Sequence, residues 1–252
     1  SPFKMTLQYY LHRCGLAARR KVNAIIEGGR VRVNGVVVRD FWAPVDPEKD
    51  RITVDGAVCA LPLGHRYYLF HKPSGLITTV SDPQGRPTVI DYVRRVHGLS
   101  GPLHPTGRLD KETEGLLILT DDGDFTYRIT HPSHEIPKVY LAVLQSEIGH
   151  EQILLLESGV VIDGVKTAKA KLSETRLEKR GFTGRPCWRI TIHEGKKRQV
   201  RRLFESVGSR VVYLRRDQIG PFTLEGIEIP GQIREIDENE LEDFRKAYFN
   251  DG

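Results

Sequence analysis

The chain is poor in cysteine and contains no long apolar run. Its three cysteines, Cys14, Cys59 and Cys187, are far apart, form no C-x-x-C pair and are odd in number, which argues against a disulfide framework and a thiolate metal site. No stretch approaches the roughly 20 apolar residues of a membrane helix. Residues 1–4 lack the features of a secretory signal. These absences predict a cytoplasmic protein of a reducing compartment that does not associate with membranes. An organellar protein whose transit peptide has been removed is the alternative.

Cofactor signatures are also missing. The sequence has no P-loop, no dinucleotide-binding fingerprint and no metal-ligand spacing. His131 and His134 are spaced to share a helical face, but Pro132 and Pro137 favour a loop over a metal site there. We therefore expect neither a metal nor a nucleotide cofactor, which weighs against a methyltransferase or a metal-dependent nuclease.

Positive charge is in excess and is concentrated in two places. The 252 residues include 38 Lys and Arg against 33 Asp and Glu. Residues 1–40 contain eight basic and two acidic residues, and residues 176–216 contain thirteen basic and three acidic residues. Because phosphate contacts dominate nucleic-acid affinity, this distribution predicts a polyanion held at two places. The alternative is that some of these cations lie on solvated helix faces.

The first quarter of the chain has the pattern of two helices followed by a hairpin. Apolar residues recur at helical spacing over 7–26 and are interrupted at Gly15, which predicts two short helices. Residues 30–38 alternate around Asn34-Gly35, a strong hairpin signal, and a further strand is expected at 51–54. We expect a first domain at 1–60, a linker at 61–66 and a second domain at 67–252.

Two motifs of this first domain combine paired arginines with glycine turns. They are Gly15-Leu16-Ala17-Ala18-Arg19-Arg20 and the segment 25–35, which joins G-R-V to the Asn-Gly turn. Together they resemble the S4 RNA-binding domain, although that family usually has Ser where Ala18 stands. Backbone N–H groups and cations at the start of the second helix would both face a phosphate. The resemblance implies RNA binding through Arg13, Arg19, Arg20, Lys21, Arg30 and Arg32.

From residue 67 onward, strands and helices are mixed. Strands are predicted at 67–71, 76–79, 116–120, 139–144, 168–174, 189–193 and 210–214. Helices are predicted at 88–96, 123–130, 150–157, 197–207 and 238–248. Several strands follow one another without an intervening helix, which favours an α+β fold with an antiparallel-rich mixed sheet over a doubly wound parallel sheet.

One carboxylate in the second domain is a candidate nucleophile. Gly107-Arg108-Leu109-Asp110 forms a turn ahead of the apolar strand 116–119. A turn packed on a rigid strand can hold a single Asp as a nucleophile. The alternative is an exposed Arg/Asp turn before an ordinary strand.

Two further segments belong with Asp110 if it is a nucleophile. Lys138 and Tyr140 share one face of their strand, and a Tyr on this less apolar face can stack on a base; a core or rim aromatic is the alternative. In 194–204 a glycine turn leads into a basic helix. An arginine beside a buried carboxylate keeps that carboxylate ionised, whereas the alternative is a helix flank that only contacts phosphates.

Two loops supply further candidate RNA contacts. Lys72-Pro73-Ser74-Gly75 has the pattern of a strand that ends in a Pro-Gly turn, and residues 82–89 that of a loop that ends in a helix cap at Thr88. We expect Lys72 and Arg86 to contact RNA and neither to be catalytic.

Taken together, these motifs resemble the RsuA/RluB-type ribosomal RNA pseudouridine synthases, which carry an N-terminal S4 domain. The matched pieces occur in the family's order. They are K-P-x-G at 72–75, G-R-L-D at 107–110 with E-G-L-L-x-L-T-x-D-G, K-x-Y at 138–140, E-G-x-x-R-Q-V-R-R at 194–202, and Leu214 with Ile219-Gly220.

The resemblance implies an isomerase that needs no cofactor. Asp110 would attack a flipped-out uridine at C6 of the base or C1′ of the ribose, with Tyr140 stacked on the base and Arg201 paired with Asp110. Leu214 would line the uracil pocket, and Arg108 would fill the space that the base leaves. Phosphate contacts can offset the cost of extruding a nucleotide; in this domain they are expected from Lys72, Arg86, Lys196, Lys197, Arg198 and Arg202.

The loop 82–89 and the segment 198–202 look more like the RluB branch, which acts on large-subunit (23S) ribosomal RNA, than the RsuA branch, which acts on small-subunit (16S) RNA. The resemblance therefore implies pseudouridine formation in 23S RNA, as free RNA or in an assembling ribosomal subunit, by a monomeric enzyme. The alternatives are the same reaction on 16S RNA, or a non-catalytic RNA-binding ribosome-assembly factor.

Overall fold

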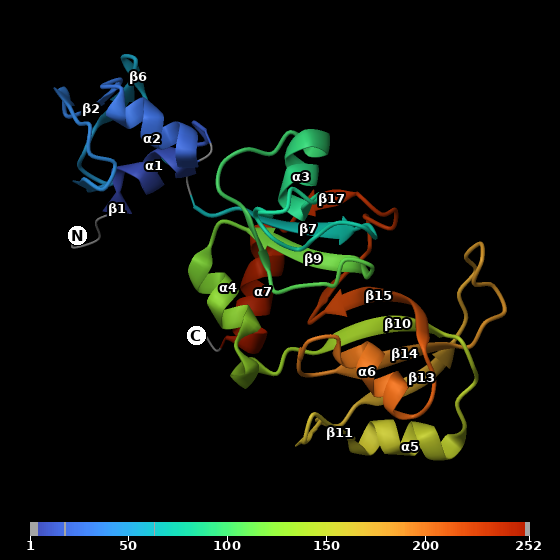
Figure 1. The fold of residues 1–252 in the computed structure, drawn as a ribbon. Coiled ribbons are helices and arrows are strands. Elements are labelled where there is room, and N and C mark those ends of the chain that lie inside the picture. Colours follow the sequence, from blue (N-terminus) through green and yellow to red (C-terminus); the bar gives the residue numbers. More distant parts are fainter. Residues whose placement is uncertain (1–4, 18, 63, 250–252) are drawn as a thin grey trace. The chain divides into compact units, whose positions relative to one another are not determined.

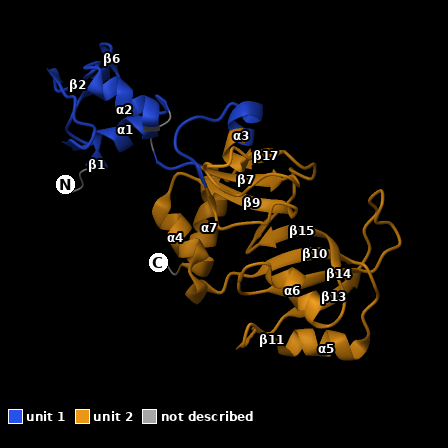
Figure 2. Ribbon diagram, in the orientation of Figure 1, with its two compact units in different colours: residues 1–66, 92–104 blue, residues 67–91, 105–252 orange. Residues whose placement is uncertain are grey.

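The computed structural model describes residues 5–17, 19–62 and 64–249, and it divides into two compact units (Figure 2). The first unit comprises residues 1–66 and 92–104, and the second comprises residues 67–91 and 105–252. The change of unit after residue 66 falls at the end of the expected linker, whereas residues 92–104 group with the first unit.

The first unit contains two helices and a small sheet from residues 5–62 (Figure 1), together with most of helix α3 (Val89–His97). Helix α1 (Leu7–Arg13) begins after Thr6, whose side chain accepts a hydrogen bond from the N–H of Tyr9. Helix α2 (Arg19–Glu27) follows a turn in which Gly15 has φ of +79°. The predicted interruption at Gly15 is therefore confirmed. The strands run in the order β3 (Val36–Val37), β2 (Val31–Val33), β5 (Ile52–Val54) and β6 (Ala57–Val58), with β1 (Met5–Thr6) and β4 (Pro44–Val45) as a separate pair.

The predicted hairpin forms at Asn34-Gly35. Both residues have positive φ, +51° and +83°, which is the conformation that a two-residue turn needs to match the twist of its strands. The core beneath this sheet consists of apolar side chains from both helices and from β2 and β5; those without solvent exposure include Leu7, Leu11, Val22, Ile26, Val31 and Ile52.

A nine-stranded mixed sheet forms the second unit. Its main strands run in the order β13 (Lys171–Thr175), β14 (Cys187–Ile192), β10 (Lys138–Leu144), β15 (Val211–Ile219), β9 (Glu114–Thr120), β7 (Tyr67–Lys72) and β17 (Ile233–Glu235). Two short strands, β8 (His104–Thr106) and β16 (Phe222–Thr223), pair with β9 and β15 respectively. Every main pairing is antiparallel except that of β15 with β9. The predicted antiparallel-rich α+β fold is confirmed.

The parallel junction between β9 and β15 joins two antiparallel halves of the sheet. Only two residue pairs make it, Glu114 with Arg215 and Gly115 with Arg216. Strand β9 continues directly from the turn that carries Asp110, while β15 carries Leu214. The junction therefore brings two widely separated motifs of the sequence side by side.

Helices cover the sheet. Helices α4 (Gly123–Thr130) and α7 (Glu238–Tyr248) lie beside each other (Figure 1), and Phe125, Ile129 and Phe244 pack from them onto apolar side chains of β7 and β9. Helix α6 (Gln199–Ser206) buries Val200 and Phe204. The remaining elements are α3 (Val89–His97), the 3-10 turn η1 (Pro132–His134), α5 (His150–Ser158) and the pair β11 (Val161–Ile162) and β12 (Val165–Lys166). Among the described helices, none has the length and apolar character needed to cross a bilayer.

Most predicted elements of this unit form, but the short elements β8, η1, β11, β12 and β16 were not predicted, and three further differences stand out. Residues 76–79 make no strand, because Ile77 forms only an isolated bridge with Thr88. Strand β15 continues five residues beyond its predicted end, to Ile219. Strand β17 was missed, since Ile233–Glu235 is a short segment with charged residues that gains its partners only from β7 at the sheet edge.

Candidate active site

Asp110 lies in a turn that several hydrogen bonds hold in place. Thr78 Oγ1 donates to the carbonyl of Leu109 (2.8 Å) and accepts from its N–H (3.3 Å). The N–H of Thr113 donates to the carbonyl of Asp110 (3.0 Å). Gly107, at the start of the turn, has φ of +74°, a conformation that favours glycine. The Asp110 side chain is 30% exposed, so its carboxylate is fixed by the backbone yet accessible from outside.

Lys72 supports this turn from beneath and does not contact solvent. Its side chain is fully buried, and Nζ donates to the carbonyls of Pro73 (3.0 Å), Lys111 (3.0 Å) and Thr113 (2.7 Å). The prediction that Lys72 contacts RNA is therefore wrong, because its buried ammonium donates to the backbone carbonyls of Pro73 and of Lys111 and Thr113, which follow Asp110. Burial lowers the pKa of Lys72 to about 8, and the nearby carboxylates oppose that shift.

Two arginines from the basic segment of α6 approach the Asp110 carboxylate. Arg198 Nη1 lies 3.6 Å from Asp110 Oδ2, and Arg201 Nε lies 4.0 Å from the same oxygen. Arg201 is buried, and its Nη2 donates to Thr113 Oγ1 (3.1 Å). Arg198 stands at the start of α6 with φ of +54°, an uncommon conformation for a residue with a side chain. Two guanidinium groups therefore lie within 4.0 Å of one oxygen of the Asp110 carboxylate.

A second carboxylate, Glu112, shares these arginines. Its Oε1 lies 2.7 Å from Arg198 Nη1 and 3.7 Å from Arg201 Nε. Partial burial acts to raise the pKa of Glu112, but the hydrogen bond from Arg198 and both positive charges outweigh it, and the net shift is downward. The sequence analysis missed Glu112. Its position two residues after Asp110 was the only hint in the sequence, and a single acidic residue in a charged turn is not enough to predict a role in the site.

Across the pocket from this turn, β10 and β15 present one continuous face. Tyr140 pairs with Arg216, and Ala142 with Leu214, so that Tyr140, Leu214 and Arg216 all reach the pocket. Arg216 Nη1 donates to the Tyr140 hydroxyl at 3.5 Å. On the opposite face of the same strands, Leu141, Val143 and Tyr213 form a separate apolar cluster. The predicted facing of Tyr140 is therefore confirmed.

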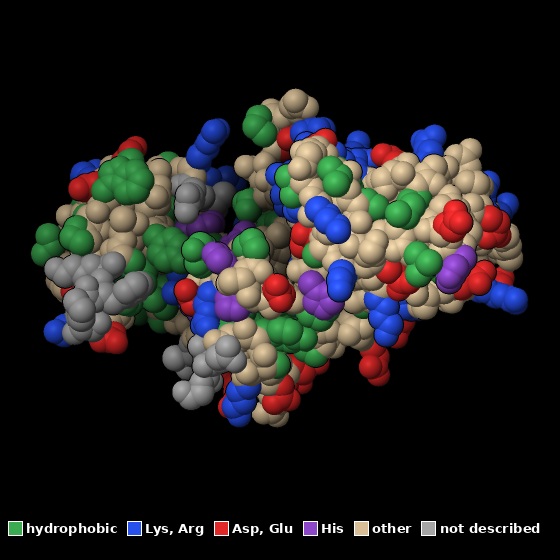
Figure 3. Space-filling model, turned by 90° about the horizontal axis from the view of Figure 1, so that it is seen from below, with side chains coloured by type: hydrophobic (Ala, Val, Ile, Leu, Met, Phe, Trp, Pro, Cys, Tyr) green, Lys and Arg blue, Asp and Glu red, His purple; other side chains and the backbone are tan. Residues whose placement is uncertain are grey.

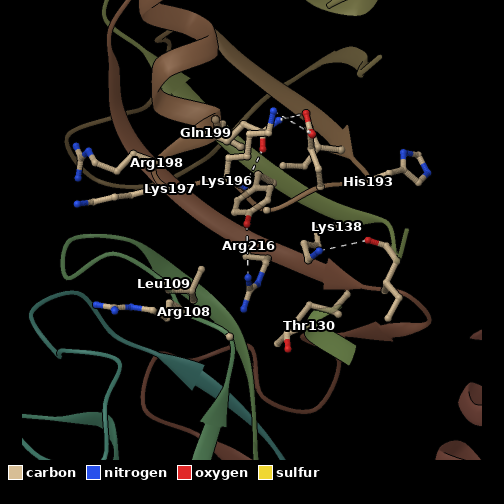
Figure 4. A pocket seen from close by; sticks show the side chains of 18 of the residues that line it. Arg108, Leu109, Thr130, Lys138, His193, Lys196, Lys197, Arg198, Gln199 and Arg216 are labelled. Carbon is tan, nitrogen blue, oxygen red and sulfur yellow. Dashed lines mark hydrogen bonds and ion pairs between the residues drawn. The ribbon is translucent and has the colours of Figure 1, made fainter. Parts of the chain in front are cut away.

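The cavity enclosed by these elements has a volume of about 650 Å³, within the range of small-molecule sites. Asp110, Tyr140, Leu214 and Arg108 all line it, whereas Arg201 approaches Asp110 from α6. The exposed Arg108 lies on the wall below Leu109 (Figure 4). The structure thus brings the five residues that the resemblance singled out to one place.

The predicted RNA-contacting cations fall into two groups in the second unit. Lys196, Lys197 and Arg198 are exposed and line the cavity. Arg202 instead pairs with Asp163 (2.5 Å) and lines a smaller cavity of about 300 Å³, and Arg86 pairs with Asp82 (2.9 Å) within its own loop. On the face shown in Figure 3, basic side chains are interspersed with acidic ones.

In the first unit, most predicted RNA contacts are accessible. Arg20, Lys21 and Arg32 are exposed, and Arg13 is half-buried. Arg30 is exposed but donates hydrogen bonds to both carboxylate oxygens of Asp55. The side chain of Arg19 and the whole of Ala18, where the S4 pattern has Ser, lie outside the described residues.

Comparison with known proteins places the chain in a family. Residues 66–206 match the RNA pseudouridylate synthase family and residues 5–47 match the S4 domain. Relatives include "Ribosomal large subunit pseudouridine synthase B" of Bacillus subtilis (36% identity over 241 residues, 95% of each chain) and the protein of the same name from Pseudomonas aeruginosa (36%, 96% of this chain and 62% of that one). A crystal structure of a pseudouridylate synthase superimposes with a TM-score of 0.61 at 28% identity and covers 94% of this chain and 98% of the other. The chain therefore belongs to the RNA pseudouridylate synthase family, in the branch that carries an N-terminal S4 domain.

Proposed function

We propose that this enzyme converts a uridine of large-subunit ribosomal RNA to pseudouridine, with Asp110 as the nucleophile. The observation that carries the proposal is the position of the Asp110 carboxylate, which lines a 650 Å³ cavity and has two guanidinium groups within 4.0 Å of one oxygen. The choice of the large subunit rests on the names of the relatives from Bacillus subtilis and Pseudomonas aeruginosa.

The reaction is an isomerisation and is balanced without a co-reactant. The Asp110 carboxylate adds to C6 of the base or to C1′ of the ribose, and the bond between N1 and C1′ breaks. The freed uracil turns, and a bond forms between C5 and C1′. C5 loses its proton and N1 gains one, so the atoms of product and substrate are the same. Regeneration of the carboxylate returns the enzyme to its starting state.

The other residues of the cavity have supporting parts in this proposal. Tyr140 stacks on the extruded base, and Leu214 contacts the uracil from the same strand face. Arg201, anchored by its hydrogen bond to Thr113 Oγ1, orients the Asp110 carboxylate, whose Oδ2 lies 4.0 Å from its Nε. Arg108, exposed on the wall, enters the gap that the flipped base leaves. Lys196, Lys197 and Arg198 line the cavity as exposed cations, where they can hold the flanking phosphates.

The test combines pseudouridine mapping with one substitution. Chemical probing of ribosomal RNA from cells with and without the gene will locate the uridine, and the purified enzyme should then convert an RNA hairpin that contains it. Asp110→Asn should bind this hairpin normally and form no product. Asp124→Asn, an exposed aspartate in the first turn of α4, is the matched control and should keep full activity.

Three outcomes would contradict parts of the proposal. Product formed by the Asp110→Asn variant would show that Asp110 is not the nucleophile. A site mapped to small-subunit RNA would replace the proposed substrate, and the absence of any mapped site would favour a ribosome-assembly factor.

A further inference from the structure

The cavity contains two positive charges that no carboxylate neutralises. Arg216 is 4% exposed; its Nε donates to the carbonyl of Leu116 (2.9 Å) and its Nη1 donates to the Tyr140 hydroxyl (3.5 Å). Lys138 is half-buried and has a single long contact, from Nζ to the carbonyl of Ile136 (3.5 Å). Among the described residues, no carboxylate oxygen lies within 4.0 Å of either cationic group.

Both cations belong to the same wall as Tyr140. Lys138 and Tyr140 project from one face of β10, and Arg216 is the direct partner of Tyr140 on the adjacent strand β15. All three line the cavity, and Figure 4 shows Lys138 and Arg216 there. The loop that closes this end is near, because a Cβ added to Gly195 would lie 3.8 Å from Lys138 Nζ. Burial lowers the pKa of Lys138 to about 8, and the charge of Arg216 adds to that effect.

The acidic residues that line the cavity do not supply the missing charge. Asp110 is paired with Arg198 and Arg201 at the opposite wall. Glu194 accepts hydrogen bonds from Gln199 Nε2 (2.7 Å) and from the N–H of Ala168 (2.8 Å). Glu135 is exposed and forms no ion pair with Lys138. Because a buried charge is stable only with a counter-charge, an anionic group of the bound ligand is the remaining source.

The substrate determines which anion this is. Uracil and ribose are neutral, and the phosphodiester is the one charged group of a nucleotide within an RNA strand. We propose that Lys138 and Arg216 form a subsite for a phosphodiester that flanks the target uridine, located at the hydroxyl end of the Tyr140 ring; this inference rests on the proposed function. An ammonium and a guanidinium that converge on one site are the usual partners of phosphate oxygens.

Neutral linkages test the subsite directly. The RNA is the hairpin that the wild-type enzyme converts, prepared with a methylphosphonate immediately 5′ of the target uridine, immediately 3′ of it, or at a distant linkage. Binding is measured with the Asp110→Asn enzyme so that no reaction intervenes. One of the two flanking substitutions should weaken binding at least about tenfold, whereas the distant one should have a much smaller effect.

Variants of Lys138 then test whether this side chain is the group that binds the charged phosphodiester. In the same Asp110→Asn background, Lys138→Gln should weaken binding of unmodified RNA by about tenfold and should abolish the difference between charged and neutral linkage. Lys138→Arg should restore that difference. Lys171→Gln, an exposed lysine on β13 outside the cavity, should behave like the parent.

Persistent sensitivity of Lys138→Gln to the neutral linkage would overturn the subsite, and so would equal binding of all four RNAs. These results differ from failure of the proposed function, in which the wild-type enzyme converts no ribosomal hairpin.

Discussion

Gly115 lies directly against the backbone of Arg216, where β9 and β15 run parallel. A Cβ added to Gly115 would overlap the carbonyl oxygen and the amide nitrogen of Arg216, and Gly115 has φ of +116°. Only glycine meets both conditions. The glycine of the E-G-L-L motif is therefore required by the close approach of the two sheet halves, which also brings the Asp110 turn next to Tyr140 and Leu214.

Substitution of this glycine should damage both folding and activity. We expect Gly115→Ala to lower the free energy of unfolding by more than about 1 kcal/mol, because the strands must separate or the backbone must change conformation. Urea denaturation measures the loss, and conversion of the target RNA should fall as well. Gly123→Ala, in the first turn of α4 with open space around it, is the control and should be neutral or slightly stabilising. Equal urea midpoints for the two variants would contradict this account of the junction.

Lys72 donates three hydrogen bonds to backbone carbonyls, and two of these, to Lys111 and Thr113, hold the Asp110 turn. Lys72→Met fills a similar volume but leaves these buried acceptors unsatisfied, so we expect a loss of at least about 2 kcal/mol of unfolding free energy and a fall in activity. Lys111→Met changes an exposed lysine in the same turn and should cost little. If Lys72→Met unfolds at the urea midpoint of the wild type, the ammonium has no structural part.

The lowered pKa of Lys72 predicts how the stability of the protein depends on pH. Burial lowers the pKa of Lys72 from 10.5 to about 8 in the folded protein. Between these values the unfolded chain keeps a proton that the folded chain has released, so the unfolding free energy contributed by Lys72 rises as pH increases from about 8 to about 10.5. The difference in stability between wild type and Lys72→Met should widen over this interval. Lys138 has a similar shift but is present in both proteins and cancels. Parallel stability curves would show that Lys72 is not desolvated.

The sequence predicted features that depend on local pattern. The alternation of β10 placed Tyr140 opposite Leu141 correctly, and the bounds of α4 were exact because Asp122 caps the helix by accepting from the N–H of Phe125. The Asn34-Gly35 turn was equally clear, since both of its residues need positive φ.

Features that depend on distant partners could not be predicted in this way. The charge of Lys72 suggested a surface contact, but the three carbonyls that bury it come from residues up to 41 positions away. Glu112 gains its importance from Arg198, a residue 86 positions further along the chain. Neither partner is indicated by the residues next to Lys72 or Glu112 in the sequence.

Glu112 should affect stability more than catalysis. Its side chain is 47% exposed, so solvent screens its pairs with Arg198 and Arg201, and Glu112→Gln should cost at most about 1 kcal/mol. The pKa of Glu112 is lowered in the folded protein. Its stabilising contribution is therefore present above the ordinary pKa near 4.5 and is lost as pH falls toward the folded value. Urea denaturation of both proteins between about pH 3 and about pH 7 should show the difference shrinking in acid.

Arg201 should be essential for the rate because its guanidinium lies 4.0 Å from the Asp110 carboxylate and is anchored by a hydrogen bond to Thr113. Arg201→Lys keeps the positive charge but cannot reach Asp110 Oδ2 and Thr113 Oγ1 with a planar fork. We expect conversion of the target RNA to fall by about 100-fold, with RNA affinity nearly unchanged. Arg202→Lys is the matched control, since the neighbouring arginine pairs with Asp163 instead. Single-turnover rates and binding constants separate the two effects. If Arg201→Lys converts the RNA at a rate within about threefold of the wild-type rate, Asp110 needs only a nearby positive charge and not the geometry of the arginine.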